Sequence, residues 1–524
     1  MQLNAQQEAA ASAIDGVWVV IAGPGSGKTT VMVERYIRML MSGINTRDIL
    51  NLTFTNAAAE QMVHRVGMTD AKSAFRTFHS FALEVLKKER EHLPFELCEE
   101  VIPVKAQDYN LLKELVHQFR DLDYRKLREK ITRWKCENID SDQARDEASG
   151  HLECLYALAY EEYEKSSRMQ GWLDFDDCIK ETVVLLESND AVRARWKRRY
   201  ISVDECQDTD EKQFRLLQLI FDGNLFAVGD ENQLIYEWRS AKSGNLTNFA
   251  QKFPGAKTLY LGQNYRSTKK LVEFFKQIIP VDNGITSHMI TDNDHGLDPT
   301  IIEYENGLQE ADRVLAKIKD PEHTAVLART NRQLFVFQKF CTTRNIKYKF
   351  LGKDGFWQQP EVKRLLKLAK ESNDTRPANE VLTDLISQHN LVWIYRNTGD
   401  IDNDPVKNLN DAVRMAAGKG TVTEFLNFLR RLTYATKATK CLTLSTVHQA
   451  KGREYEYVFL VGASQGKMPH RDGEIGEERR IFFVACSRAA KHLEISYFGH
   501  PSEFLNNYIE RIKVYEPEES RAEV

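Results

Sequence analysis

The sequence predicts an α/β fold built on a parallel β-sheet, and two apolar segments that each end in polar residues carry this prediction. Residues 17–22 (VWVVIA) are apolar throughout and rich in β-branched side chains, which is typical of a strand buried on both faces. Residues 199–203 (RYISV) form a second such strand. A glycine-rich segment follows the first strand and two carboxylates follow the second. Because ligands of open α/β sheets bind at the carboxyl ends of strands, both segments are candidate site residues.

The glycine-rich segment, residues 23–30 (GPGSGKTT), lies between the first strand and a helical pattern. Strand, glycine loop and helix in this order are the context of a phosphate-binding loop. Its backbone N–H groups point at phosphate oxygens, and the helix amino terminus adds a partial positive charge. Lys28 is expected to reach the β- and γ-phosphates of ATP, and Thr29 to bind Mg²⁺. The nucleotide-binding residues expected here are Ala22, Gly23, Pro24, Gly25, Ser26, Gly27, Lys28, Thr29 and Thr30.

Asp204 and Glu205 stand directly after the second strand. Asp204 is expected to hold Mg²⁺, directly or through water, and Glu205 to orient and deprotonate an attacking water. A solvated acidic loop is the alternative, because acidic pairs after strands are common. The phosphate-binding loop elsewhere in the chain favours the catalytic interpretation.

Composition places the chain among ordinary globular proteins. It has 524 residues, which predicts three or four domains, with 42 % hydrophobic and 28 % charged residues and a net charge of −4. The eight cysteines are scattered without C-x-x-C spacing, which argues against a zinc or iron–sulfur site. The first residues lack the features of a signal peptide, and no apolar run approaches the ~20 residues of a membrane span. A cytoplasmic protein is therefore expected.

An ordered series of segments between residue 3 and about residue 495 resembles the motifs of superfamily 1A helicases, the group of UvrD, Rep and PcrA. In chain order these segments are 3–7, 22–29, TFTN at 53–56, TFHS at 77–80, DECQD at 204–208, VGDENQLIYEWRSA at 228–241, QNYRS at 263–267, STVHQAKGREYEYVFLVG at 445–462 and EERRIFFVACSRA at 477–489. The resemblance implies two RecA-like P-loop NTPase domains, each a parallel sheet with flanking helices. It also implies ATP-driven movement along single-stranded DNA in the 3′-to-5′ direction.

The resemblance also implies roles for residues around ATP. Gln7 would read the adenine edge, Tyr265 would stack on the base, and Glu454 would contact the ribose. Gln233 would sense the γ-phosphate, and Arg266 and Arg488 would approach it as charged forks. The catalytic set is thus Lys28, Asp204, Glu205, Gln233, Arg266 and Arg488.

The nucleic-acid site implied by the resemblance consists of Phe54, Asn56, His79, Tyr236, Trp238, Arg239 and His448. Aromatic side chains stack on bases without regard to sequence, which a motor that passes every base requires. Tyr236 and Phe54 have core packing as their alternative, and His79 has a turn position. The partners expected are single-stranded DNA and junctions between single-stranded and duplex DNA.

The resemblance predicts four domains, two of them insertions. Residues 1–85 and 175–255 would form domain 1A, and residues 256–370 and 436–524 would form domain 2A. The mainly helical insertion 1B would span 86–174, and a reduced 2B-like insertion would span 371–435. The LDFDD segment at 173–177 is interpreted as a helix start, with a metal site as the alternative.

Two other functions remain open from the sequence. The chain resembles compact motor subunits that work with a nuclease partner, such as the helicase of the Gabija anti-phage system. A nucleotide-gated module that binds DNA ends without moving is an alternative of another class. Intact Lys28, Glu205 and Arg488 argue against the second alternative, because such a module needs no hydrolysis machinery.

Overall fold

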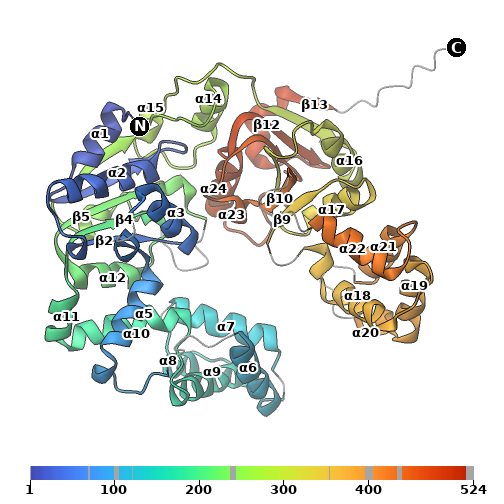
Figure 1. The fold of residues 1–524 in the computed structure, drawn as a ribbon, viewed down its shortest axis with the longest axis horizontal. Helices are drawn as coiled ribbons and strands as arrows, with labels where there is room; N and C mark the ends of the chain where they lie inside the picture. The colour runs from blue at the N-terminus through green and yellow to red at the C-terminus, as the bar shows by residue number, and fades with distance from the viewer. Residues whose placement is uncertain are drawn as a thin grey trace. The chain divides into compact units, whose positions relative to one another are not determined.

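The chain forms two compact units (Figure 1). The computed structural model describes residues 2–68, 71–98, 105–120, 122–137, 139–235, 243–352, 355–395, 405–433 and 440–514. The first unit comprises residues 1–263 and 283–288, and the second comprises residues 264–282 and 289–524. Each contains a parallel sheet with flanking helices, which confirms the predicted fold class. In the ranges described, no helix has the length and apolar character needed to cross a membrane.

The first sheet has six strands in the order β3-β2-β4-β5-β1-β6, and every pairing is parallel. The strands are β1 (Val17–Ala22), β2 (Ile49–Thr53), β3 (Phe75–Thr77), β4 (Arg198–Val203), β5 (Phe221–Gly229) and β6 (Lys257–Leu261). The helices are α1 (Ala5–Ser12), α2 (Lys28–Met41), α3 (Asn56–Val66), α4 (Ala71–Ala74), α5 (Phe78–Lys88), α10 (Phe175–Ser188), α11 (Asp190–Trp196), α12 (Glu211–Ile220), α13 (Phe249–Lys252) and α15 (Ile285–His288).

Both faces of this sheet are buried, because alternate residues of each strand enter different cores. Val19 and Leu225 pack in a core that contains residues of α5, α10 and α12. Their neighbours Val20 and Phe226 pack in another core with residues of α1 and α2. The continuous apolar run at 17–22 is therefore explained by burial on both sides. This packing fixes the strand ends from which the site residues project.

The first sheet extends further along the chain than the sequence predicted. We expected domain 1A to end at residue 255, but β6 pairs with β1 from Trp18 opposite Lys257 to Ala22 opposite Leu261. The first unit therefore continues to Gln263. The pairing partner of β6 lies about 240 residues earlier in the chain, beyond the reach of local sequence patterns.

The first insertion is helical, as predicted, and has a hydrophobic core of its own. It contains α6 (Lys105–Gln118), α7 (Tyr124–Glu137), α8 (Ser141–Asp146) and α9 (His151–Met169). Lys135 of α7 is 4 % exposed and donates to Asp174 Oδ2 at 2.5 Å and to Asp177 Oδ2 at 2.6 Å. Asp174 also caps α10 by accepting from the Asp177 backbone N–H. The LDFDD segment is thus a helix start that anchors the insertion.

The second sheet has seven parallel strands in the order β13-β7-β12-β11-β8-β10-β9. They are β7 (Thr300–Tyr304), β8 (Thr324–Ala328), β9 (Tyr348–Leu351), β10 (Leu442–Thr446), β11 (Tyr455–Leu460), β12 (Ala489–Phe498) and β13 (Ile512–Val514). The helices of this sheet are α14 (Lys269–Ile278), α16 (Gly307–Lys317), α17 (Gln333–Thr343), α23 (Val447–Ala450) and α24 (Ile475–Cys486).

The second insertion is a small helical group between β9 and β10. It contains α18 (Pro360–Ser372), α19 (Ala378–Gln388), α20 (Leu391–Tyr395), α21 (Pro405–Ala416) and α22 (Val422–Thr433). Leu365, Leu382, Leu409 and Phe425 lie at the centre of its core and are fully buried. The expected reduced insertion is therefore a packed unit with an interior of its own.

Candidate functional site

The phosphate-binding loop connects β1 to α2 with two glycines in left-handed conformation. Gly25 has a φ of 68° and Gly27 a φ of 83°, values that favour glycine because it lacks a Cβ. Gly27 directly precedes α2, and a Cβ at this position would lie 2.7 Å from the Gln7 amide nitrogen. The Ser26 hydroxyl donates to the Gly23 carbonyl at 2.8 Å. The loop thus places the amino terminus of α2 where an anion is stabilised by the helix dipole.

Gln7 is fastened to this loop. Its amide nitrogen donates to the Ser26 carbonyl at 3.0 Å, and its amide oxygen accepts from the Asn4 backbone N–H at 3.2 Å. Asn4 in turn caps α1 by accepting from the Gln7 backbone N–H. The side chain of Gln7 is 5 % exposed. Gln7 therefore lies beside the glycine loop and ties α1 to it.

The two carboxylates at the end of β4 have different surroundings. Asp204 is buried, and burial raises its pKa to about 7, with the charge of Glu205 adding to the rise and Lys28 opposing it. Glu205 is partly exposed and lies with Oε1 3.9 Å from Lys28 Nζ. The structure thus brings Lys28 to Asp204 and Glu205, although it lies more than 170 residues before them in the chain.

Glu205 is held by a chain of hydrogen bonds that reaches the end of β5. Its backbone has φ 49° and ψ 44°, an unusual conformation for a residue with a side chain. Glu205 Oε2 accepts from the Gln207 amide nitrogen at 2.7 Å, and the Gln207 amide oxygen accepts from the Asp230 backbone N–H at 3.0 Å. Asp230 Oδ2 accepts from the Gln233 amide nitrogen at 2.7 Å. The expected base and the expected phosphate sensor are therefore linked through Gln207.

The residues at this edge fit a divalent cation. Asp204 Oδ1 is buried and has no hydrogen-bond partner among the described residues, which is costly for a carboxylate unless another group compensates it. Thr29 occupies the first turn of α2, one residue after Lys28. A carboxylate and a hydroxyl oxygen are ligands that Mg²⁺ accepts. Asp204 and Thr29 are thus the residues that would hold it.

The second unit gathers Arg266, Glu454 and Arg488 around Ser487. Arg266 Nε donates to Glu454 Oε2 at 2.8 Å, and its Nη1 donates to the Ser487 carbonyl at 2.9 Å. Arg488 is 1 % exposed, and its guanidinium donates to the Val484 and Arg453 carbonyls and to the Ser487 hydroxyl. Glu454, expected at a ribose, is paired with Arg266 here. Tyr265 is 46 % exposed, as a stacking residue requires.

The expected strand-binding residues lie at the carboxyl ends of strands in both units. Phe54 and Asn56 follow β2, and the Thr55 hydroxyl between them caps α3. His79 lies in the first turn of α5, whose amino terminus Thr77 and Ser80 cap reciprocally. His448 lies in α23 after β10, where burial and nearby cations lower its pKa to about 4. Tyr236, Trp238 and Arg239 lie outside the described residues.

Three features of the structure were missed by sequence reasoning. Gln207 was identified only as part of a motif, and its contacts depend on β4 and β5 being neighbours. Phe175 is 61 % exposed, with its ring centroid 5.7 Å from that of His79. The second unit has a cavity of about 500 Å³ lined by Lys467, His470, Arg471 and Phe498, among others. The one signal for Phe175 in the sequence was an aromatic residue directly after the helix cap Asp174.

Two family models match the chain. The model of the UvrD/REP helicase N-terminal domain matches residues 3–254. The model of the UvrD-like helicase C-terminal domain matches residues 259–386 and 367–500. Together the two models cover both units and both insertions.

The similar proteins are helicases of comparable extent. The ATP-dependent DNA helicase Rep of Escherichia coli is 27 % identical over 608 aligned residues, which span 94 % of this chain and 90 % of Rep. Rep of Salmonella typhimurium is 27 % identical over 612 residues, with 94 % and 90 % covered. The ATP-dependent DNA helicase PcrA of Staphylococcus epidermidis is 26 % identical over 628 residues, covering 96 % of this chain and 86 % of PcrA. Each alignment is longer than the 524 residues of this chain. It therefore contains gaps opposite residues that only the relatives possess, as a compact member requires.

The phosphate-binding loop of the first unit, the paired carboxylates beside it and the two matched domain models show that the chain belongs to the UvrD/Rep family of superfamily 1A helicases.

Proposed function

We propose that this protein is an ATP-driven DNA helicase that moves 3′ to 5′ on single-stranded DNA. The observation that carries the proposal is the placement of Lys28, Asp204 and Glu205 at the carboxyl edge of the first sheet. Rep and PcrA, which are similar over more than nine tenths of this chain, are both named ATP-dependent DNA helicases. The direction of movement rests on the family resemblance.

In the proposed reaction, Lys28 binds the β- and γ-phosphates, and Glu205 accepts a proton from the attacking water. Gln207 keeps Glu205 oriented through its 2.7 Å hydrogen bond. Thr29 and Asp204 would hold Mg²⁺, which when bound neutralises charge on the phosphate oxygens. Arg266 and Arg488, which the second unit carries, would stabilise charge on the γ-phosphate, with Gln233 as its sensor in the first unit.

Adenosine recognition would come from Gln7, Tyr265 and Glu454. For Glu454 this requires exchange of its Arg266 partner for the ribose. Contact of Arg488 with the γ-phosphate requires its release from two backbone carbonyls and one hydroxyl. ATP binding would thus compete with contacts inside the second unit, which supports a switch between two arrangements.

Strand contacts in this proposal come from Phe54, Asn56, His79 and His448, together with Tyr236, Trp238 and Arg239. Stacking contributes ~1–3 kcal/mol per base and is independent of sequence. Trp238 and Gln233 are five residues apart in one motif, so strand and phosphate are sensed by neighbouring parts of the chain. We expect Trp238→Ala to keep basal ATP hydrolysis but to lose its stimulation by single-stranded DNA.

The first test is ATP hydrolysis without nucleic acid and with single-stranded DNA, single-stranded RNA or duplex DNA. We expect strong stimulation by single-stranded DNA, and a loss of ~10²–10⁴ in kcat in Glu205→Gln, because general-base catalysis contributes about that much. Displacement of a strand from a 3′-tailed duplex but not from a 5′-tailed one would support the direction. Hydrolysis that no nucleic acid stimulates would contradict the proposal and favour a motor that requires a protein partner such as a nuclease.

A further inference from the structure

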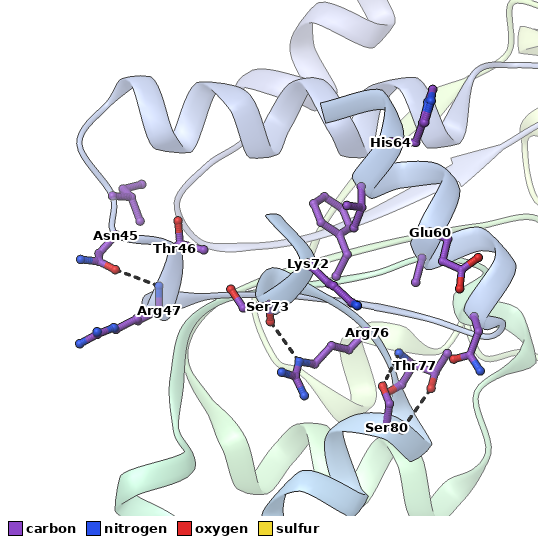
Figure 2. Close-up of a pocket in the computed structure, with 15 residues that line it drawn as sticks. Asn45, Thr46, Arg47, Glu60, His64, Lys72, Ser73, Arg76, Thr77 and Ser80 are labelled. Carbon is purple, nitrogen blue, oxygen red and sulfur yellow. Dashed lines mark hydrogen bonds between the residues drawn. The ribbon is translucent and has the colours of Figure 1, made fainter. Parts of the chain in front are cut away.

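The first unit carries a groove of about 1490 Å³, most of whose lining has no role in the proposed motor reaction. It lies between the short 3₁₀ turn Thr46–Asp48, α3, the α4–β3 segment and the start of α5. Figure 2 shows Arg47 at one end of the groove, Thr77 and Ser80 at the other, and Lys72 and Arg76 between them. The groove therefore runs along the edge of the sheet where β3 is the last strand.

One end of the groove is continuous with the proposed strand site. Asn56, Thr77 and Ser80 line it, and all three belong to the TFTN and TFHS segments at the carboxyl ends of β2 and β3. The other end of the groove lies before β2, next to the amino ends of the strands. The five residues of β2 rise about 3.3 Å each, so the groove extends roughly 17 Å beyond the motif residues. That length accommodates several phosphates of a nucleic-acid strand, which are spaced ~3.4 Å or more apart.

The charge of the groove fits a polyanion. Arg47, His64 and Lys72 are exposed, and none of them has an ion-pair partner among the described residues. Arg76 also lines the groove. Its Nε donates to the Ser73 carbonyl at 3.1 Å, and its guanidinium forms an ion pair with Glu84. Among the described residues of the lining, Glu60 is the one acidic side chain. The chain as a whole carries a net charge of −4, so this cationic lining is a local feature.

The edge strand argues against a peptide as the occupant. β3 has only three residues, Phe75–Thr77, so it offers too few backbone groups for a peptide to add as a further strand. The apolar residues of the lining, Ile44, Ala59, Val63 and Phe75, are buried or half-buried, whereas the cations Arg47, His64 and Lys72 are exposed. Exposed cations placed along a channel are the chemistry of phosphate contacts that do not read sequence.

We propose that this groove binds the phosphodiester backbone of the single strand where it leaves the first unit, with Arg47 and Lys72 as its main contacts. The groove lengthens the strand site beyond the motif residues and holds the released part of the strand during stepping. This inference rests on the proposed strand-dependent motor, because it needs a strand bound at Asn56 and Ser80. It predicts that affinity grows with strand length after the motif site is full.

The test is binding of oligothymidylates of increasing length by fluorescence anisotropy at several salt concentrations, with Arg47→Glu/Lys72→Glu compared with the wild type. We expect equal binding of the shortest oligomers and a loss of about tenfold or more on the longer ones. The slope of log K against log salt on long oligomers should fall by about 1.4, since each contact to a single strand contributes ~0.7. The matched control is Lys87→Glu/Arg90→Glu, two exposed cations of the same unit outside the groove.

Two outcomes would overturn the inference. Unchanged binding and salt slope on long oligomers would show that the groove holds no strand. Equal losses on short and long oligomers would place both cations inside the motif site instead. Stimulation of ATP hydrolysis by a short oligomer is measured in parallel. Stimulation of the double variant shows that its fold and motor are intact. Lack of stimulation in the wild type counts against the proposed function alone.

Discussion

The amide of Gln207 joins Glu205 to the β5 end: it donates to Glu205 Oε2 at 2.7 Å while accepting from the Asp230 backbone N–H at 3.0 Å. We predict that Gln207→Leu lowers kcat for strand-stimulated ATP hydrolysis by ~10- to 100-fold, part of the full contribution of a general base. The KM for ATP should change little, because Gln207 does not line the phosphate loop. Steady-state hydrolysis over a range of ATP concentrations measures both. The control is Gln218→Leu, on the exposed side of α12. An equal kcat in the two variants would show that Gln207 does not orient Glu205.

Gly229 offers an independent way to disturb the same contact. A Cβ added at Gly229 would lie 2.3 Å from the Gln207 amide oxygen, which is closer than atoms can approach. We predict that Gly229→Ala displaces Gln207 and lowers kcat in the same direction as Gln207→Leu, with no further loss in the double variant. Gly476→Ala is the matched control, since only the Arg480 guanidinium comes near its added Cβ, at 3.8 Å. Additive losses in the double variant would separate the two effects and refute the shared mechanism.

Phe175 projects from the start of α10 beside His79, with 61 % of its surface exposed. We predict that its ring stacks on a base and that Phe175→Ala weakens single-stranded DNA binding by ~1–3 kcal/mol, or roughly five- to 150-fold. Trp393→Ala serves as comparison, because Trp393 is 77 % exposed on the second insertion. Anisotropy titrations with an oligothymidylate measure both variants. Similar affinities for the two would mean that the exposure of Phe175 has no role in binding.

Lys135 anchors the first insertion through two carboxylates. Burial alone would lower its pKa, but the charges of Asp174 and Asp177 raise the pKa of Lys135 well above its ordinary range. We predict that Lys135→Met destabilises the protein by ~3–5 kcal/mol, because it leaves two carboxylates near each other without their cation. Urea unfolding measures the change. Lys165→Met removes an exposed pair with Glu161 on α9 and should change stability little, so equal stabilities in the two variants would contradict an anchoring role.

The sequence was sufficient for those parts of the site that are local in the chain. The β1–loop–α2 segment was predicted with its residues in order, because strand, glycine loop and helix follow one another directly. The helix start at Asp174 was predicted for the same reason, since a cap needs only residues within three positions. Lys28, Asp204 and Glu205 could be identified by residue type and motif, and the structure brings them together.

Contacts set by the order of strands lay beyond sequence reasoning. The link from Gln207 to Asp230 exists because β4 and β5 are neighbours. The pairing of β6 with β1 has the same cause, since β1 begins at Val17, far from β6 in the chain. The groove beside α3 combines residues from five separate elements, and its cations look like ordinary surface charge in the sequence. Such features depend on topology, which short patterns do not encode.

The place of β1 between β5 and β6 matters while the protein is being made. Val17 pairs with Leu225, and Trp18 pairs with Lys257. A ribosome that adds ~5–20 residues per second therefore completes these partners roughly 10–50 s after β1 has been made. During that interval the segment VWVVIA has neither neighbouring strand, whereas all four helices of the first insertion are made before β5 begins. The strand that later supports the nucleotide loop can thus pair with the same segment of another nascent chain on the same messenger RNA. The yield of folded protein then depends on keeping this segment from such pairing.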